Sequence, residues 1–159
     1  MRREMPAKAA QQDDLKLDDF LCFAVYSASH AFSRVYKPML DQLKLTYPQY
    51  LVMVALWETD DQTVGALGDR LSLESNTLTP LLKRLEITGY VRRDRDPRDE
   101  RQVRVSLTEA GRDLRAEAEK VPACILEASG LDAADLGRLR QQITALRGAL
   151  ENYQKRPVQ

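Results

Sequence analysis

The sequence predicts a mainly α-helical fold with one small β-hairpin. Along most of the chain, apolar residues recur about every three to four positions, as they do on one face of an amphipathic helix. The period changes at 103–107, where Val103, Val105 and Leu107 alternate with polar residues, as in a strand with one face in water. The 159 residues suffice for one domain with a hydrophobic core, and 30% charged with 43% hydrophobic residues is an ordinary composition for a soluble protein.

Two segments are expected before the central domain. Residues 1–14 are polar and lack periodicity, which predicts a flexible N-terminal tail. A long helix is predicted within 15–44, with Pro38 near its end. Its apolar seam advances by steps of four and three residues and consists of Leu21, Val25, Ala28, Phe32, Val35 and Met39.

Residues 45–107 are expected to form a compact central domain. A buried helix should begin near Thr46 or Pro48, because proline suits a first helical turn. A short strand and a short helix should follow in QTVGALGDRL. The next helix should end at Gly89, which suits a C-terminal cap, and should hold Pro80 near its first turn. Its candidate N-caps are Ser75, Asn76 and Thr77.

A hairpin closes the central domain. YVRRDR is the predicted partner of the strand at 103–107, and the charged DPRDER between them opens with Asp-Pro, a turn signal. Helical periodicity then resumes in 108–154, in one helix that Pro122 should kink and a second that starts near Asp132. The apolar seam of the second helix consists of Leu136, Leu139, Ile143, Leu146, Leu150 and Tyr153.

The helices at the two ends, 15–44 and 108–154, carry apolar seams that need cover. They pair either with each other or with a second copy of the chain, and seams of this length favour a homodimer. We therefore expect 15–44 and 108–154 to be dimerisation helices. No apolar run approaches the roughly 18 residues of a membrane span, so no membrane partner is expected, and the N-terminus lacks a signal-peptide pattern, which predicts a cytoplasmic protein.

The central domain has the order of a winged helix-turn-helix, which suits double-stranded DNA. A major groove admits one α-helix, whose N-terminal residues meet the base edges, and arginine at a hairpin tip is attracted into an adjacent minor groove. Between Lys83 and Arg104 there are eight Lys/Arg and five Asp/Glu. The side chains expected to meet DNA are Ser75, Asn76, Thr77, Thr79, Lys83, Arg84, Arg98 and Arg101. The alternative is that these side chains are ordinary helix caps and a solvated turn.

Specific stretches extend this interpretation to a family. RRDRDPRDERQVRVSLTEAG resembles the wing and following helix of the MarR family of dimeric bacterial transcription regulators, with L-T-x-x-G after the wing. LCFAVYSASHAFSRVYKP, LTYPQYLVMVALWE and TLTPLLKRLE are similar to its organic-hydroperoxide-sensing branch, OhrR. The resemblance implies a homodimer that represses a pseudo-palindromic operator when reduced. It implies that Ser75, Thr77 and Thr79 contact DNA. It also implies that Arg101 enters the minor groove and that Asp99 holds the Arg101 side chain in position. Asn76 stands where relatives often have glycine.

Cys22 is the candidate sensor. It shares a polar stripe, not the apolar seam, with Tyr26, Ser29, Ser33 and Tyr36. If Asp18 or Asp19 caps the helix, the thiol lies in the first turn, where free N–H groups favour a thiolate. The resemblance implies that Tyr36 and Tyr47 hydrogen-bond this thiolate. Because fourteen helical residues span about 21 Å, Tyr36 must come from the partner subunit.

The expected chemistry is oxidation of Cys22 by an organic hydroperoxide to a sulfenic acid, followed by a disulfide. Apolar neighbours should select organic hydroperoxides, and the expected sensor pocket consists of Phe20, Leu21, Phe23 and Tyr26. Cys124 is the candidate resolving thiol, with small thiols as the alternative. The sequence leaves open whether the disulfide joins two chains. If the thiols lie more than about 7 Å apart, oxidation must move a helix and so respace the recognition helices.

Other readings remain at this point. In one alternative, both cysteines are unreactive side chains of apolar helices. The protein would then be a regulator that responds to a small phenolic ligand, and Cys22 would have no role in sensing. A thiol peroxidase is a further alternative, although residue 19 is Asp and the T-x-x-C signature of peroxiredoxins is absent. No cofactor is expected, and the lone His30 lacks companions for a metal site.

Overall fold

The computed structural model of the chain describes residues 15–155, and the predicted tail at 1–14 lies outside them. The elements are a short 3₁₀ turn η1 (Leu17–Asp19) and the helices and strands α1 (Leu21–Gln42), α2 (Tyr47–Glu58), β1 (Gln62–Thr63), α3 (Val64–Leu71), α4 (Ser75–Thr88), β2 (Val91–Asp96), β3 (Asp99–Leu107), α5 (Glu109–Asp113), α6 (Arg115–Ala118), α7 (Ala123–Ser129) and α8 (Ala133–Gln154). The strands form an antiparallel sheet in the order β1-β3-β2. The predicted fold class, mainly helical with a small hairpin wing, is confirmed.

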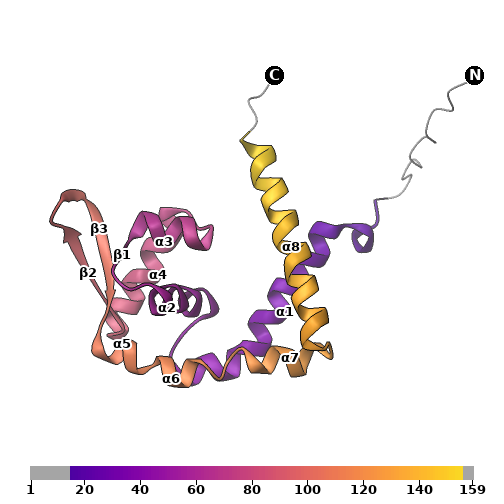
Figure 1. The fold of residues 1–159 in the computed structure, drawn as a ribbon, viewed down its shortest axis with the longest axis horizontal. Helices are drawn as coiled ribbons and strands as arrows, with labels where there is room; N and C mark the ends of the chain where they lie inside the picture. The colour runs from indigo at the N-terminus through magenta and orange to yellow at the C-terminus, as the bar shows by residue number, and fades with distance from the viewer. Residues whose placement is uncertain (1–14, 156–159) are drawn as a thin grey trace, which may run out of the picture.

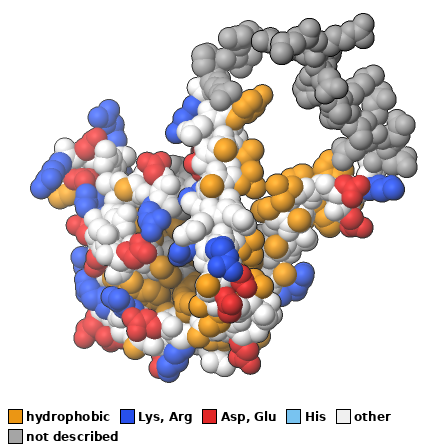
Figure 2. Space-filling view, turned by 45° about the vertical axis from the view of Figure 1, so that its right-hand side comes forward, with side chains coloured by type: hydrophobic (Ala, Val, Ile, Leu, Met, Phe, Trp, Pro, Cys, Tyr) orange, Lys and Arg blue, Asp and Glu red, His pale blue; other side chains and the backbone are white. Residues whose placement is uncertain are grey.

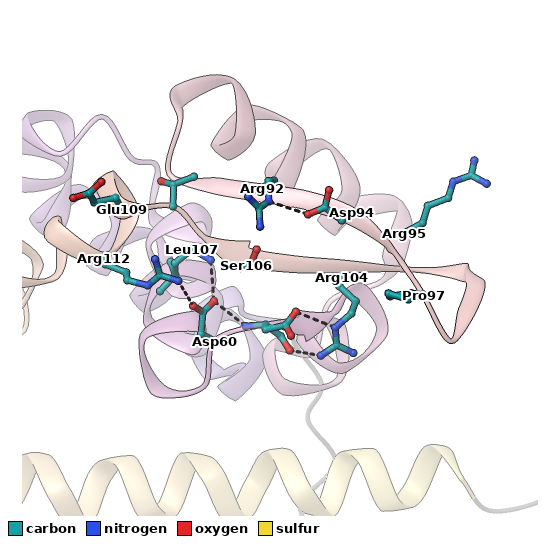
Figure 3. Close-up of a pocket in the computed structure, with 12 residues that line it drawn as sticks. Asp60, Arg92, Asp94, Arg95, Pro97, Arg104, Ser106, Leu107, Glu109 and Arg112 are labelled. Carbon is teal, nitrogen blue, oxygen red and sulfur yellow. Dashed lines mark hydrogen bonds and ion pairs between the residues drawn. The ribbon is translucent and has the colours of Figure 1, made fainter.

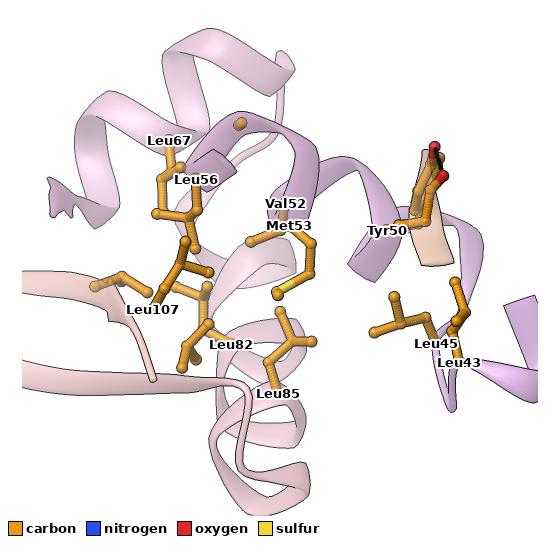
Figure 4. Packing of buried hydrophobic residues seen from close by; sticks show 14 of the residues in the cluster. Leu43, Leu45, Tyr50, Val52, Met53, Leu56, Leu67, Leu82, Leu85 and Leu107 are labelled. Atoms are coloured by element: carbon orange, nitrogen blue, oxygen red, sulfur yellow. Dashed lines mark hydrogen bonds between the residues drawn. The ribbon is translucent and has the colours of Figure 1, made fainter. Parts of the chain in front are cut away.

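One lobe, which we call the head, contains the core. The head comprises α2, β1, α3, α4, β2 and β3, and Figure 1 shows it apart from the long helices α1 and α8. Its centre is a cluster of fully buried apolar side chains from the helices and the sheet (Figure 4). These include Val52, Met53, Leu56, Leu67, Leu78, Leu82, Leu85 and Val105. The β2–β3 hairpin projects from the head as a wing.

The wing strands are longer than the sequence predicted. β3 begins at Asp99, and the pairing of Asp96 with Asp99 leaves only a tight turn where the charged loop DPRDER was expected. Both faces of this outer part lie in solvent, so its residues do not alternate between apolar and polar. Periodicity therefore detected only the inner half of the strand at 103–107.

Two helix starts test the capping predictions. α2 begins with a full capping box, in which Gln49 N–H donates to Thr46 Oγ1 and Thr46 N–H donates to Gln49 Oε1. The prediction for α4 was wrong by one to three residues. Its N-cap is Glu74, which makes no side-chain capping bond among the described residues, and Ser75 is already helical. Pro80 consequently lies in the second turn, where its missing N–H leaves the carbonyl of Asn76 without the usual helical partner.

The segment between the wing and α8 is more broken than predicted. In place of one kinked helix there are the short helices α5, α6 and α7. Pro122 stands as the N-cap of α7, because proline cannot donate the hydrogen bond that would join it to the turn before. α8 begins after Asp132, whose side chain accepts a hydrogen bond from Asp135 N–H, as predicted.

The long helices leave their apolar seams uncovered. α1 buries only Leu40, and α8, which lies wholly within the described residues, buries no side chain. Figure 2 shows hydrophobic side chains along both helices, outside the head. The exposed members include Phe20, Leu21, Val25, Phe32, Val35, Leu139, Ile143 and Leu150. Within residues 15–155 no helix combines the length and apolarity that crossing a membrane requires.

Candidate functional site

The predicted DNA-reading side chains lie on the surface of the head. Every polar residue predicted at the start of the recognition helix α4 is exposed, and so are the basic residues one to two turns later. These are Ser75, Asn76, Thr77, Thr79, Lys83 and Arg84. A groove of about 390 Å³ between α4 and the wing brings Ser75, Thr79 and Arg101 to one place.

The tip of the wing holds an exposed arginine, Arg101. The side chain of Arg101 is 90% exposed, and its Nε donates to Asp99 Oδ1 at 3.1 Å. Asp99 Oδ1 also accepts from the backbone N–H of Arg101 at 3.1 Å. The carboxylate therefore restrains Arg101 at both its backbone and its guanidinium. Arg98 is exposed in the same turn, where its backbone N–H donates to Asp96 Oδ1 at 2.8 Å.

An ion-pair network along the wing, which sequence reasoning missed, joins the hairpin to the rest of the head (Figure 3). Arg104 on β3 contacts Asp96 at 3.1 Å and Asp61 at 2.9 Å. Asp96 is almost fully buried, and the Arg98 backbone N–H, together with Arg104, holds the pKa of its carboxyl below the usual value. Asp60 accepts from the backbone N–H of Leu107 at 2.8 Å. Because these charges pair with one another, the network holds the wing in a fixed position against the rest of the head.

A second pair links α4 to the wing. Arg93 on β2 donates from Nε and Nη2 to Glu86 Oε2 at 3.0 and 2.9 Å, and from its backbone N–H to Glu86 Oε1 at 3.3 Å. These hydrogen bonds lower the pKa of Glu86. Arg93 also lines the groove beside α4, so the pair sets the angle between the two elements that face it.

We expect Glu86→Gln to destabilise the head at neutral pH by less than about 1 kcal/mol, because the pair is partly exposed. The folded-state pKa of Glu86 is lowered, so its contribution is present above its usual pKa and disappears as the pH falls through the lowered value. Urea unfolding of both proteins should therefore give curves that differ at pH 7 and converge in acid. A difference that stays constant with pH would show that packing, not charge, is responsible.

The predicted sensor residues lie at the free end of α1. Cys22 is the second residue of the helix and is exposed, as are Phe20, Leu21 and Tyr26, while Phe23 is half-buried. The N-cap is Phe20, not the predicted aspartates, which lie in the preceding 3₁₀ turn. Cys22 still lies in the first turn of α1, where the backbone N–H groups have no helical partner. The residues 15–155 of a single chain do not close a pocket around it.

A cluster of aromatic hydroxyls lies near the other end of α1. Tyr36 stacks on Tyr47 of α2 with ring centroids 5.4 Å apart, and Tyr50 lies 6.3 Å from Tyr36. Cys124 of α7 is close enough to affect the ionisation of Tyr36 and Tyr50. We call Tyr36, Tyr47, Tyr50 and Cys124 the tyrosine pocket. Three of its members were predicted; Tyr50 was missed, although its spacing of three from Tyr47 on a helix was a usable signal.

The electrostatics of the tyrosine pocket suit hydrogen-bond donation. Burial raises the pKa of Tyr36 to about 12, and Tyr47, Cys124 and Tyr50 add to the shift. Burial also raises the pKa of Tyr47 and of the Cys124 thiol. The phenols therefore keep their protons at neutral pH and can donate to an anion placed among them. Cys124 itself is favoured as a thiol.

The structure does not bring Cys22 to the tyrosine pocket of its own chain. α1 is continuous from Leu21 to Gln42, so Cys22 and Tyr36 are separated by about 21 Å of helix. An apolar cavity of about 780 Å³ adjoins Tyr47 between α1, α7 and α8 and contains Phe32, Leu126 and Ile143 in its wall. The chemistry-bearing groups of one chain thus form two half-sites at opposite ends of one helix.

Comparison with known proteins places this arrangement among gene regulators. Residues 34–118 match the family model "Transcriptional regulator SarA/Rot". The chain is 44% identical over 134 residues to the organic hydroperoxide resistance transcriptional regulator of Bacillus subtilis, covering 84% of this chain and 91% of that protein. It is also 44% identical over 149 residues to the HTH-type transcriptional regulator TtmR of Methylorubrum extorquens, covering 94% of this chain and 76% of the relative.

Solved structures of the regulator AbfR have the same fold. Reduced AbfR bound to DNA superposes with a TM-score of 0.66 at 38% identity, over 82% of this chain and 94% of AbfR. AbfR with a disulfide formed superposes with a TM-score of 0.59 at 36% identity, over 88% of this chain and 93% of AbfR. A protein similar to this chain has therefore been seen both reduced on DNA and with a disulfide.

Proposed function

Because the chain belongs to the MarR family of transcription regulators, alongside the organic hydroperoxide resistance regulators, we propose that it is a redox-sensing repressor. As a reduced homodimer it binds double-stranded operator DNA, and an organic hydroperoxide releases it by oxidising Cys22. Its family and relatives are regulators, not enzymes, which argues against the thiol peroxidase alternative. We assign it to the cytoplasm, where its operator DNA lies.

The observation that carries this proposal is the position of Cys124. It lies within the tyrosine pocket, at the opposite end of α1 from the exposed Cys22. Two copies paired in opposite directions along their uncovered seams would bring Cys22 of the partner subunit to Tyr36, Tyr47 and Cys124. The same pairing would cover Leu21, and burying each such side chain contributes roughly 1.5–3 kcal/mol.

The proposed chemistry has two steps. The Cys22 thiolate, held by the phenolic O–H groups of Tyr36 and Tyr47, attacks the O–O bond of the hydroperoxide. A sulfenic acid forms, and the alkoxide takes a proton and leaves as an alcohol. Cys124 of the other subunit then attacks the sulfenic sulfur, the hydroxide leaves as water, and an intersubunit disulfide remains. The apolar side chains Phe20, Leu21 and Phe23, with Tyr26, would favour an organic substituent.

Operator binding is assigned to the exposed face of the head. Ser75, Asn76, Thr77 and Thr79 would meet base edges in the major groove. Lys83 and Arg84 would neutralise phosphates, and Arg101, restrained by Asp99, would enter the minor groove with Arg98 beside it. The dimer sets the spacing of the two recognition helices, so a movement of α7 toward the partner's thiol would change that spacing.

One observation favours a second candidate, a MarR-type repressor that answers to a small phenolic ligand. The 780 Å³ cavity beside Tyr47 is apolar and large enough for such a molecule. In this alternative Cys22 is idle and the cavity holds the inducer. In the homodimer, however, the apolar seam of the partner would occupy part of the same space.

The test is an operator-binding titration of the reduced dimer with and without cumene hydroperoxide. We expect oxidation to weaken binding by about 100-fold, within the usual range of allosteric coupling, and a reductant to restore it. Unchanged affinity after complete oxidation of Cys22, together with release by a phenolic compound, would replace the redox proposal by the ligand alternative.

A further inference from the structure

Two hydrogen bonds join α2 to the segment α5–α7. Trp57 Nε1 donates to the carbonyl oxygen of Gly111 at 2.9 Å, and the Tyr50 hydroxyl donates to the carbonyl oxygen of Ala118 at 3.3 Å. Cys124 lies near enough to Tyr50 to affect its ionisation, and we call these three approaches of α2 to the segment the ladder. Along α2 the ladder runs from Tyr50 to Trp57, and along the segment it runs backwards from Cys124 through Ala118 to Gly111. Both donors are aromatic and lie in edge contact, 6.5 Å apart.

The Gly111 end of the ladder is firmly attached to the wing and to α4. Thr108 Oγ1 accepts from Gly111 N–H at 3.1 Å and donates to the carbonyl oxygen of Gly89, the C-cap of α4, at 2.6 Å. The backbone N–H of Thr108 donates to the carbonyl oxygen of Tyr90 at 3.1 Å. Gly111 is pressed so closely on Tyr90 that a Cβ would lie 2.1 Å from that carbonyl oxygen. We call this set of contacts the joint.

Toward Cys124 the segment is attached to the head through Ala118 and Val121, whose side chains are buried in the core. Between the joint and α7 the chain breaks into turns at Leu114 and at 119–122, and each helix is only a few residues long. Figure 1 shows α5, α6 and α7 in sequence along one edge of the molecule, leading from the head to α8. A pocket of about 240 Å³ lies between the segment and α2, lined by Tyr50, Trp57 and Ala118 among others. A pull on α7 can therefore bend the segment at its breaks.

We propose that Trp57 positions the joint so that a displacement of α7 rotates the head as a rigid body. Trp57 would then transmit the structural change caused by oxidation of Cys22 to the DNA-binding face. The indole bond ties α2, the central helix of the head, to the first helix of the moving segment. Without it, α2 keeps one of the two hydrogen bonds, that of Tyr50 to Ala118. The joint then holds only the wing and the end of α4, and most of the displacement is absorbed by bending between α5 and α7. This inference rests on the proposed redox function and extends it to a residue that contacts neither thiol nor DNA.

The test is Trp57→Phe, which removes the N–H donor and keeps an aromatic side chain in place. We expect the operator affinity of the reduced variant to stay within about threefold of that of the reduced wild-type protein. Its Cys22 should be oxidised at the wild-type rate. The loss of affinity on oxidation should shrink from about 100-fold to less than about tenfold, because the coupling and not the sensing is removed. Glu58→Gln is the matched control. It is the neighbouring residue and loses its ion pair with Arg70, which lies within the head.

Each outcome is decisive. Release of oxidised Trp57→Phe to the wild-type extent overturns this proposal, whereas a wild-type protein that stays bound after oxidation overturns the proposed function and this proposal with it. A second measurement needs no variant. The chain has one tryptophan, so one indole N–H signal reports the bond in solution. Slow hydrogen exchange of that N–H in both redox states supports the proposal, and rapid exchange in either state contradicts it.

Discussion

A Cys22→Ser variant is expected to bind the operator like the reduced wild-type protein and to remain bound after treatment with cumene hydroperoxide. Serine has nearly the size of cysteine and occupies an exposed first-turn position, so the helix and the dimer seam should be unaffected. A hydroxyl, unlike a thiolate, does not attack a peroxide O–O bond at neutral pH. The expected change is therefore the loss of the whole response, about 100-fold in operator affinity.

The matched control is Cys124→Ser. Its Cys22 should still be oxidised to a sulfenic acid, which a sulfenic-acid probe detects, while no protein disulfide forms. Operator affinity and mass, measured on the same samples, separate the two steps. A Cys22→Ser protein that leaves the operator in response to peroxide would refute the assignment of the sensor thiol.

Gly111→Ala is expected to destabilise the protein by about 3 kcal/mol or more, since overpacking against a fixed backbone cannot be relieved by rotating a side chain. The new Cβ would lie 2.1 Å from the carbonyl oxygen and 3.0 Å from the carbonyl carbon of Tyr90. To make room, α5 must move away from Tyr90, the residue before β2. That movement strains the hydrogen bonds of Thr108 and the bond from Trp57.

Gly65→Ala is the control for this substitution. At Gly65 a Cβ would meet only Thr63 Oγ1, at 4.0 Å. Because alanine is the better helix former, we expect Gly65→Ala to be neutral or stabilising by up to about 1 kcal/mol. Urea unfolding of the three proteins measures both effects. Equal stabilities of Gly111→Ala and wild type would mean that α5 does not pack on the backbone of Tyr90 as described.

The joint explains why part of the sequence could be interpreted so specifically. The stretch L-T-x-x-G after the wing served as a family signature, and in the structure each of its three specified residues makes a contact that requires its residue type. Leu107 is buried, Thr108 caps α5 and bonds the end of α4, and Gly111 allows close contact with the backbone of Tyr90. Where local chemistry demands one residue type, as here and in the capping box of Thr46, sequence reasoning located the elements correctly.

Sequence reasoning failed where the determining contacts are distant in the chain. Tyr50 reads as one more apolar residue of α2, and only folding brings it beside Cys124. The network of Asp60, Asp61 and Arg104 joins positions more than forty residues apart, so no local pattern announces it. The caps of α4 were misplaced because several polar residues in a row all suit an N-cap. The apolar seams of α1 and α8 were recognised, because a heptad pattern is visible without knowing its partner.

The central claim is that the redox site is shared, with Cys22 supplied by one subunit and Cys124 with its tyrosines by the other. Mixed dimers test it most directly. Cys22→Ser chains and Cys124→Ser chains, distinguished by a tag of different length, are unfolded together, refolded, treated with cumene hydroperoxide and separated without reductant. The shared site predicts a disulfide-linked dimer that contains one chain of each kind, while each variant alone forms no disulfide-linked dimer. If the mixture yields no such product and oxidised wild-type protein runs as a monomer with an internal disulfide, the two thiols belong to one chain and the account is contradicted.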